Sequence, residues 1–269
     1  MTFSYQKYSP TGNVTVLVTT PVPRSMQPGI AARLLEDVGG EQVGFIEPVT
    51  DSRCAARLQM MGGEFCGNAT MSLGAMLARE TGLSDGAAMD LLLEVSGSAD
   101  PVACHILRAG EAFTGTVQMP LPTGVGEAVL DTDAGALTVP LVRLPGIAHL
   151  ILPADAGLDE AQLRRRLPLW NDAIGADAIG ALRFNADALS MDPLVWVPSA
   201  GTLVREHGCG SGTAAIGCIQ ALAAGRDVEA GVRQPGGTII VRASVEGNAI
   251  TALSITGRVT LVEEGNYKY

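Results

Sequence analysis

A short cysteine motif occurs twice in this chain, as CGNATMSLGAML from Cys66 to Leu77 and as CGSGTAAIGCIQ from Cys209 to Gln220. Both copies begin with Cys-Gly, place a threonine four residues after the cysteine and a glycine eight residues after it. One copy in each half of the chain indicates a duplicated unit. We therefore expect two related domains, each of which presents one cysteine to a shared site.

The length and charge of the chain narrow its class. Its 269 residues leave room for two domains, and 47% hydrophobic with 17% charged residues is typical of a folded globular protein. The net charge of −10 argues against nucleic-acid or anionic-membrane partners, because phosphate binding needs concentrated Lys and Arg. No apolar run reaches the roughly 18 residues of a membrane span, and the N-terminus lacks an apolar signal segment. We expect a cytoplasmic protein that acts on a small molecule.

The cysteines are predicted to be reduced thiols, because their number is odd and no export signal is present. No CxxC, HxxxH or HExxH spacing occurs, so we expect no metal site. A cysteine in an Ala- and Gly-rich segment is usually a small buried apolar residue, and this interpretation suits Cys54, Cys104 and Cys218. The matched Cys66 and Cys209 instead stand where a loop enters a helix, a position that favours reactivity.

Most of the chain reads as strands. A turn at residues 10–12 separates two of them, a helix over about 28–37 ends at Gly39 and Gly40, and a second helix over 158–170 is capped by Asp159. The Gly247-Asn248 pair predicts a hairpin. Prolines at 120 and 122 mark a crossover between the halves. Further strands are expected at 41–49, 89–95, 102–107, 115–118, 136–144, 149–154, 181–185 and 194–198.

Each repeated cysteine is expected at a helix N-terminus. The helix dipole and unpaired backbone N–H groups favour a thiolate there, so we predict a lowered thiol pKa. Gly67 and Gly210 let the backbone approach a ligand closely, and the same N–H groups can hold a carboxylate. If the two helix ends face each other, both point at one small anion.

A lysine-bound pyridoxal phosphate is the usual electron sink for removing the α-proton of an amino acid. The only two lysines, Lys7 and Lys268, stand near the chain ends and outside any Schiff-base loop. A thiolate on one face of the substrate and a thiol on the other can instead invert the centre by taking and returning protons. The sequence therefore favours a cofactor-independent racemase.

These motifs resemble the diaminopimelate epimerase superfamily, whose members carry one CGN-type and one CG(S/T)G-type cysteine loop on two pseudo-symmetric halves. Within it the chain is most similar to the histidine racemases that supply D-histidine for staphylopine-type metallophores, through KYSPTGN, EQVGFIE, GEFCGNATMS, CGSGTAAIG and QPGGTI. The resemblance implies an α/β fold of two domains, each a mixed sheet or barrel rolled around a central helix, with the site in the cleft between them. The implied domains are 1–120 and 121–255, with a last strand at about 256–269 that can return to the first. It implies no cofactor and is compatible with a homodimer.

The resemblance also implies roles for particular residues. Cys66 and Cys209 become the acid and base pair, and the amino-acid site is lined by Asn13, Gln42, Gly67, Asn68, Glu206, Gly210 and Ser211. Glu206 and Glu41 are candidates for contacting the substrate ammonium or an imidazole, although each equally suits a solvated loop residue. His207 is expected to be a loop residue rather than a catalytic base.

The loops before the two cysteines bear on which enzyme of the superfamily this chain is. LQMMGGE before the first cysteine and REHG before the second depart from the diaminopimelate epimerase pattern, so the grip on the distal end of that substrate is missing. A diaminopimelate epimerase, a proline-type racemase and a related isomerase without paired cysteines remain the competing enzymes. A redox-sensing or amino-acid-binding protein is the non-enzymatic alternative, and exchange of the substrate α-proton would exclude it. Pocket shape, rather than these motifs, sets the side chain accepted.

Overall fold

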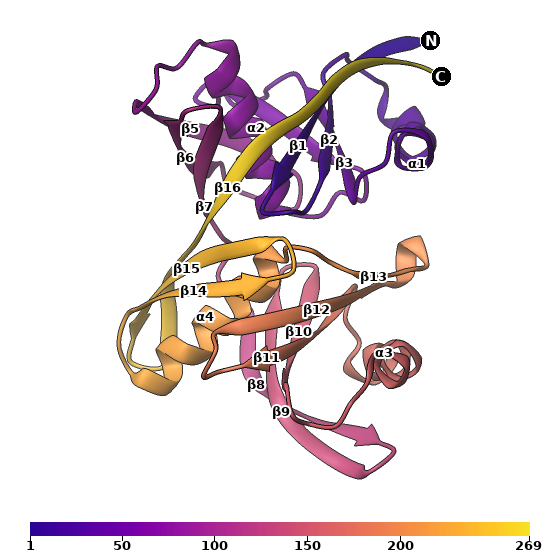
Figure 1. The fold of residues 1–269 in the computed structure, drawn as a ribbon, viewed down its shortest axis with the longest axis vertical. Helices are drawn as coiled ribbons and strands as arrows, with labels where there is room; N and C mark the ends of the chain where they lie inside the picture. Colours follow the sequence, from indigo (N-terminus) through magenta and orange to yellow (C-terminus); the bar gives the residue numbers. More distant parts are fainter. The chain divides into compact units, whose positions relative to one another are not determined.

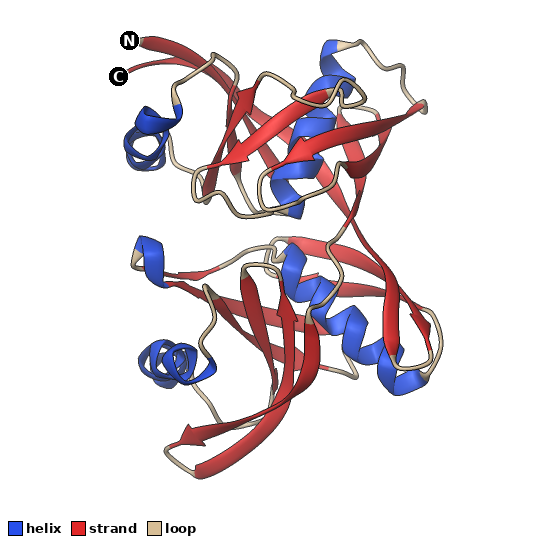
Figure 2. Cartoon of the chain, turned by 180° about the vertical axis from the view of Figure 1, so that it is seen from behind, coloured by secondary structure: helices blue, strands red, loops and turns tan.

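The computed structural model describes residues 1–269, with the backbone alone at position 200. Its contacts divide the chain into two compact units, one made of Met1–Met119 with Ile255–Tyr269 and the other of Pro120–Ser254. Each unit is a strand-rich α/β structure with one helix enclosed by strands and one on the outside (Figures 1 and 2). The α/β fold class predicted from the sequence is confirmed.

In the first unit eight strands form a closed ring in the order β1-β2-β3-β4-β5-β6-β7-β16, with β1 also pairing β16. Two helices accompany them, α1 (Gln27–Asp37) and α2 (Gly67–Glu80), after a short 3-10 helix at Arg24–Met26. Eleven of the residues of α2 are buried, because the strands surround the helix (Figure 2). The strands are β1 (Thr2–Pro10), β2 (Thr15–Val18), β3 (Gln42–Glu47), β4 (Ala56–Met60), β5 (Ala88–Val95), β6 (Val102–Ala109), β7 (Ala112–Gln118) and β16 (Ala249–Lys268).

The second unit has the sheet order β16-β15-β14-β12-β11-β10-β9-β8, with β13 pairing β12. Helix α4 (Gly210–Ala224) packs on β15, β9 and β14, and α3 (Glu160–Ile174) packs on β11 and β12. A short 3-10 helix lies at Pro198–Ala200. The strands are β8 (Gly124–Thr132), β9 (Gly135–Leu144), β10 (Ile147–Pro153), β11 (Ile179–Asn185), β12 (Ser190–Val197), β13 (Thr202–Arg205), β14 (Val228–Gln234) and β15 (Gly237–Glu246).

The topology of the first unit recurs in the second. A helix connects the parallel strands β2 and β3, and α3 connects the parallel strands β10 and β11 in the same way. An antiparallel strand follows in each unit, β4 or β12, and then the cysteine helix. The strand after the cysteine helix, β5 or β14, runs parallel to β4 or β12, and in the second unit the short β13 lies between β12 and the helix in the chain. The repeated motif in the sequence therefore corresponds to a repeated fold.

The glycines shared by the two motif copies have a packing role. A Cβ on Gly74 would lie 2.8 Å from Cys104 Sγ, and a Cβ on Gly217 would lie 2.4 Å from a methyl of Val241. Neither helix therefore has room for a side chain at this position, where it approaches its own sheet. Glycine, which has no Cβ, allows this close approach in both units.

Several element boundaries predicted from the sequence agree with the structure. Helix α1 spans Gln27–Asp37, and Asp159 caps α3 through a reciprocal pair of hydrogen bonds with Gln162. The predicted hairpin lies between β15 and β16, with Gly247 at a φ of +59°. The strand expected at 115–118 begins earlier, at Ala112, because it pairs with β6 as far as Ala109. Among the residues that the structure describes, no helix combines the length and apolar character needed to cross a membrane.

Candidate active site

Both motif cysteines occupy the N-cap of their helices. Cys66 precedes α2 and accepts a hydrogen bond at its sulfur from the Ala69 N–H, at 3.4 Å. Cys209 precedes α4 and accepts from the Gly212 N–H, also at 3.4 Å. A sulfur in this position interacts with the positive end of the helix, as the sequence predicts.

The matched threonines hold the cysteine backbones. The hydroxyl of Thr70 donates to the carbonyl of Cys66 at 2.7 Å, and the hydroxyl of Thr213 donates to the carbonyl of Cys209 at 2.7 Å. Both threonines are fully buried. The conserved spacing within the repeat therefore gives each cysteine the same backbone support.

In the first unit Cys66 belongs to a chain of hydrogen bonds that starts at its thiol. The thiol donates to Gln42 Oε1 at 3.0 Å, and Gln42 Nε2 donates to Asn13 Oδ1 at 2.6 Å and to the hydroxyl of Thr15 at 2.8 Å. Asn13 Nδ2 in turn donates to Glu41 Oε2 at 2.9 Å. The structure thus brings together Asn13, Gln42, Glu41 and Cys66, all of which the sequence singled out. Thr15 also belongs to this chain of hydrogen bonds, but it lies in no sequence motif and was not predicted.

The first two residues of α2 complete this part of the site. Gly67 and Asn68 are buried directly after Cys66, and the carbonyl of Asn68 accepts a hydrogen bond from the hydroxyl of Ser72. A Cβ on Gly67 would lie 2.9 Å from Ile255 Cδ1 and 3.0 Å from Met119 Sδ. The glycine therefore lets the start of the helix pack closely against neighbouring side chains of the same unit.

In the second unit the environment of Cys209 corrects one expectation. The sequence predicts a lowered pKa for both thiols, whereas the pKa of Cys209 is raised well above its ordinary value. Burial is the largest cause, followed by the negative charge of Glu206 and a hydrogen bond from the thiol to that carboxylate. The hydrogen bonds from Ser211 and the Gly212 N–H act in the opposite direction but are smaller.

Ser211 connects Cys209 to a histidine that sequence analysis missed. The hydroxyl of Ser211 lies 3.6 Å from Cys209 Sγ and 2.9 Å from His149 Nε2. His149 is fully buried on β10, and burial lowers its pKa to about 3, so the imidazole is neutral. His149 is a single histidine within the apolar segment HLILPA and belongs to no sequence motif, so the sequence did not indicate a role for it. Its position opposite Gly180 on the neighbouring strand leaves room for the ring.

The loop before Cys209 and the first turn of α4 contain the remaining predicted residues of this unit. Gly210 is the first residue of α4, and the backbone N–H of Cys209 donates to Gln234 Oε1 at 2.6 Å. The carbonyl of His207 accepts from the Gly236 N–H at 2.7 Å, which places His207 in the loop before the cysteine. Arg205 pairs with Asp192, with Nε and Oδ1 2.6 Å apart.

The two thiols differ in the acceptor that each one faces. The Cys66 thiol donates to a neutral amide oxygen of Gln42, whereas the Cys209 thiol donates to the carboxylate of Glu206. Each sulfur also lies near a helix N–H that can stabilise a thiolate. Burial and the Glu206 carboxylate favour the protonated form of Cys209, so this thiol has the properties of a general acid at carbon.

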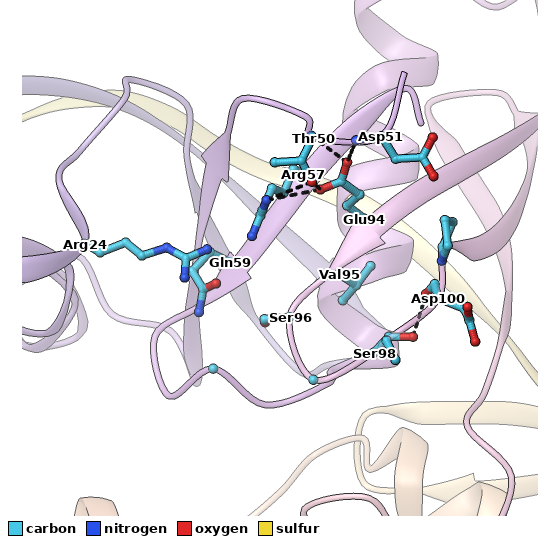
Figure 3. A pocket seen from close by; sticks show the side chains of 14 residues that line it. Arg24, Thr50, Asp51, Arg57, Gln59, Glu94, Val95, Ser96, Ser98 and Asp100 are labelled. Atoms are coloured by element: carbon cyan, nitrogen blue, oxygen red, sulfur yellow. Dashed lines mark hydrogen bonds and ion pairs between the residues drawn. The ribbon is translucent and has the colours of Figure 1, made fainter. Parts of the chain in front are cut away.

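A separate cavity of about 530 Å³ lies in the first unit, and its lining does not include Cys66 (Figure 3). On one side Glu94 accepts hydrogen bonds from Thr50 and Asp51 and pairs with Arg57. On the other side the lining includes Gly63 and Ser96, next to the loop that leads to Cys66. The cavity therefore borders the loop that precedes Cys66, and the Cys66 thiol does not line it.

Known proteins are similar to this chain along nearly its whole length. The family model for the histidine racemase CntK N-terminal domain matches residues 2–267. A histidine racemase of Staphylococcus aureus is 32% identical over 271 residues, covering 97% of this chain and 96% of the relative. A histidine racemase of Fusobacterium nucleatum is 29% identical over 218 residues, covering 78% of each chain.

Solved structures share the fold at lower identity. A hydroxyproline epimerase of Agrobacterium vitis, solved with bound trans-4-hydroxy-L-proline, has a TM-score of 0.71 at 15% identity and covers 98% of this chain and 92% of its own. A phenazine biosynthesis protein of the PhzF family from Bacillus anthracis has a TM-score of 0.69 at 17% identity, with both chains fully covered. At these identities the likeness concerns the fold.

Proposed function

Because the chain belongs to the histidine racemase family, which makes it an isomerase, we propose that it interconverts L- and D-histidine without a cofactor, using Cys66 and Cys209. The observation that carries the mechanism is the repeated N-cap position of the two cysteines. A hydrogen bond from a helix N–H supports the thiolate form of each sulfur. One cysteine in each half gives the matched pair that a two-base reaction needs.

The proton transfers balance without a further reagent. A thiolate removes the α-proton of histidine, so that a C–H bond breaks and an S–H bond forms. The other cysteine gives its proton to the opposite face of the α-carbon, which breaks an S–H bond and forms a new C–H bond. After one turnover the roles of the two sulfurs are exchanged, and the enzyme is ready to act on the product enantiomer.

The substrate carboxylate is assigned to the helix N-termini. The backbone N–H groups of Gly67, Asn68, Gly210 and Ser211 belong to the first turns of α2 and α4, and N–H groups at a helix N-terminus favour an anion. Donors placed there stabilise the negative charge that develops as the α-proton leaves. Ser211 adds a hydroxyl beside Cys209.

The substrate's positive groups are assigned to the acidic side chains. Glu206 lies against the Cys209 thiol, and Glu41 joins the network that runs through Asn13 and Gln42 to Cys66. A carboxylate favours an ammonium group or an imidazole N–H. Asn13 and Gln42 fix the orientation of that network, and these contacts support their proposed place in the site.

Deuterium exchange tests the proposal directly. Purified protein incubated with L-histidine in heavy water should incorporate deuterium at the α-carbon and yield D-histidine, with no added cofactor. A panel of L-amino acids, including proline and diaminopimelate, provides the comparison. Exchange of diaminopimelate but not histidine would replace this proposal with an epimerase, and tight histidine binding without exchange of any substrate would indicate a binding protein.

Three further assignments rest on the resemblance to histidine racemases. We place the protein in the cytoplasm, as a homodimer, and its D-histidine product in metallophore biosynthesis. Light scattering of the purified protein tests the homodimer by its mass. Fractionation of the producing cells tests the location, and loss of the metallophore on deletion tests the pathway.

A further inference from the structure

The turn that follows β5 packs against the loop that leads to Cys66. Ser96 Oγ accepts a hydrogen bond from the Met60 N–H at 2.9 Å and donates to the carbonyl of Glu64 at 2.8 Å. Met60 ends β4 and Glu64 lies two residues before Cys66, so one hydroxyl connects both ends of the intervening loop. The backbone of Ser96 is itself fixed, because its N–H donates to the carbonyl of Leu58 at 2.9 Å.

Gly97 brings the same turn into direct contact with the loop backbone. A Cβ at this position would lie 2.2 Å from the N of Phe65 and 2.7 Å from the carbonyl carbon of Glu64. These neighbours are backbone atoms, which cannot rotate away as a side chain can. Gly97 also has a φ of +75°, which L side chains rarely adopt. The Glu64–Phe65 peptide, one residue before Cys66, therefore packs against a position that only glycine can occupy without displacing it.

The second unit supports its cysteine from the corresponding turn. Gln234, at the end of β14, accepts a hydrogen bond from the backbone N–H of Cys209, and Gly236 donates to the carbonyl of His207. Strands β5 and β14 occupy equivalent places in the two units, each directly after the cysteine helix. In both units, therefore, the turn after the strand that follows the cysteine helix bonds to the loop that leads to the cysteine.

We propose that the Ser96–Gly97 turn is a positioning element that sets the place of the Cys66 thiol for proton transfer. This inference rests on the proposed function, in which Cys66 exchanges a proton with the substrate α-carbon. Ser96 and Gly97 act through the loop backbone and not on the substrate. Misplacement of a catalytic group by about 1 Å can lower the rate roughly 100-fold, so a small shift of the loop has a large effect.

The cavity beside the turn makes such a shift possible without unfolding. Gly63 of the loop and both residues of the turn line the cavity of about 530 Å³ (Figure 3). A side chain at position 97 pushes the Glu64–Phe65 peptide, and open space on the Gly63 side lets the loop move. Helix α2 packs mainly against β7, β6, β1 and β2, which bury it independently of the loop before Cys66.

The test compares two glycines with the same backbone conformation. Gly97→Ala adds the clash, whereas Gly86→Ala adds the same unfavourable φ, since Gly86 has a φ of +74° but no atom within 4 Å of the added Cβ. We expect Gly97→Ala to lower kcat for α-proton exchange roughly 100-fold, with a smaller change in KM. Gly86→Ala should retain kcat within about twofold. Alkylation of Cys66 by iodoacetamide should change its rate and pH profile in Gly97→Ala only.

A second pair of variants keeps the proposal testable if Gly97→Ala does not fold. Ser96→Ala removes both hydrogen bonds and should lower kcat roughly tenfold, while Ser96→Thr keeps the hydroxyl and should restore most of it. Wild-type kcat and Cys66 alkylation in Ser96→Ala would overturn the positioning role. Two other results would contradict the proposed function itself. These are a wild-type protein that exchanges no α-proton, and a Cys66→Ser variant that exchanges it at the full rate.

Discussion

His149 Nε2 lies 2.9 Å from the hydroxyl of Ser211, the residue whose oxygen is 3.6 Å from Cys209 Sγ. His149 Nδ1 is buried and has no hydrogen-bond partner. A buried acceptor nitrogen without a partner is tolerated better than a buried N–H, which favours the tautomer with its proton on Nε2. In that tautomer His149 donates to Ser211, and the Ser211 hydroxyl is left to donate to the Cys209 sulfur.

Replacing His149 should therefore change the acidity of Cys209. Without the Nε2–H donor, the Ser211 hydroxyl is free to turn away, and the pKa of Cys209 rises further. We expect His149→Leu, which has no donor to replace Nε2–H, to shift the alkaline limb of the exchange rate to higher pH. His105→Leu, on an exposed histidine that bonds Asp90, is the matched control and should leave the profile in place. Superimposable profiles for His149→Leu and wild type would contradict the role of the Ser211 contact.

The buried imidazole also predicts a pH dependence of stability. Its folded pKa of about 3 lies below the ordinary value of 6.5, so the unfolded chain binds more protons between these limits. The free energy of unfolding is then unaffected by this group above pH 6.5 and falls as pH decreases toward 3, by roughly 3 kcal/mol near pH 4. Urea unfolding at several pH values measures the slope. His149→Gln should flatten it, and an equal slope in that variant would assign the effect to other groups.

Glu206 should set the ionisation of Cys209 through its charge. Removing the charge with Glu206→Gln lowers the pKa of the thiol, because the negative charge and the thiol–carboxylate hydrogen bond both raise it. Each unit of decrease gives about tenfold more thiolate at a pH below the pKa. The thiolate absorbance, taken as the difference from the same protein with Cys209→Ser, measures the change. Glu229→Gln, on a glutamate paired with Arg242, should leave the titration unchanged, and the reverse pattern would contradict the prediction.

Gln42 should matter because it is the acceptor of the Cys66 thiol. Gln42→Leu removes the acceptor and both donor contacts to Asn13 and Thr15. General acid–base groups contribute roughly 100-fold or more, so loss of the orientation of Cys66 should lower kcat by at least about tenfold. Gln118→Leu, on an exposed glutamine at the end of β7, is the control for the same substitution in the same unit. Equal kcat in the two variants would remove Gln42 from the site.

Replacing either cysteine should stop the reaction while leaving the fold intact. Cys66→Ser and Cys209→Ser exchange sulfur for oxygen at the N-cap, a position that serine suits. A serine hydroxyl is a far weaker acid than a thiol, so α-proton exchange should fall below detection while circular dichroism and melting temperature stay close to wild type. Cys54→Ser, away from both helix N-termini, is the control. Full racemase activity in Cys209→Ser would exclude the two-base mechanism.

The sequence predicted those features that depend on neighbouring residues. The N-cap position of Cys66 and the glycine stop of α1 follow from local patterns, because capping and helix termination involve residues within a few positions. The capping box of Asp159 is local in the same sense. These elements could therefore be placed before any tertiary contact was known.

Features that depend on distant residues were not predictable in the same way. The raised pKa of Cys209 arises mainly from burial by the folded chain, which outweighs the helix N-terminus that the motif reveals. His149 is 62 positions from Ser211 in the chain, so no spacing rule connects them. The contact of Gly97 with the Phe65 backbone likewise requires β5 to lie beside β4. Pairing of the strands, rather than any motif, creates each of these relationships.

The repeated glycines give a prediction about stability. Gly217→Ala places a Cβ 2.4 Å from a methyl of Val241, on the adjacent strand β15. Alanine is favoured over glycine within a helix by about 1 kcal/mol, but overpacking a buried contact costs about 1–3 kcal/mol. The short distance to a branched side chain places the cost near the upper end, so the net loss should be about 2 kcal/mol. Gly126→Ala, where the added Cβ meets nothing within 4 Å, should leave the free energy of unfolding unchanged within about 0.5 kcal/mol. Urea unfolding of both variants measures these free energies of unfolding. Equal values for the two variants would mean that helix α4 can move away from the sheet without loss of stability.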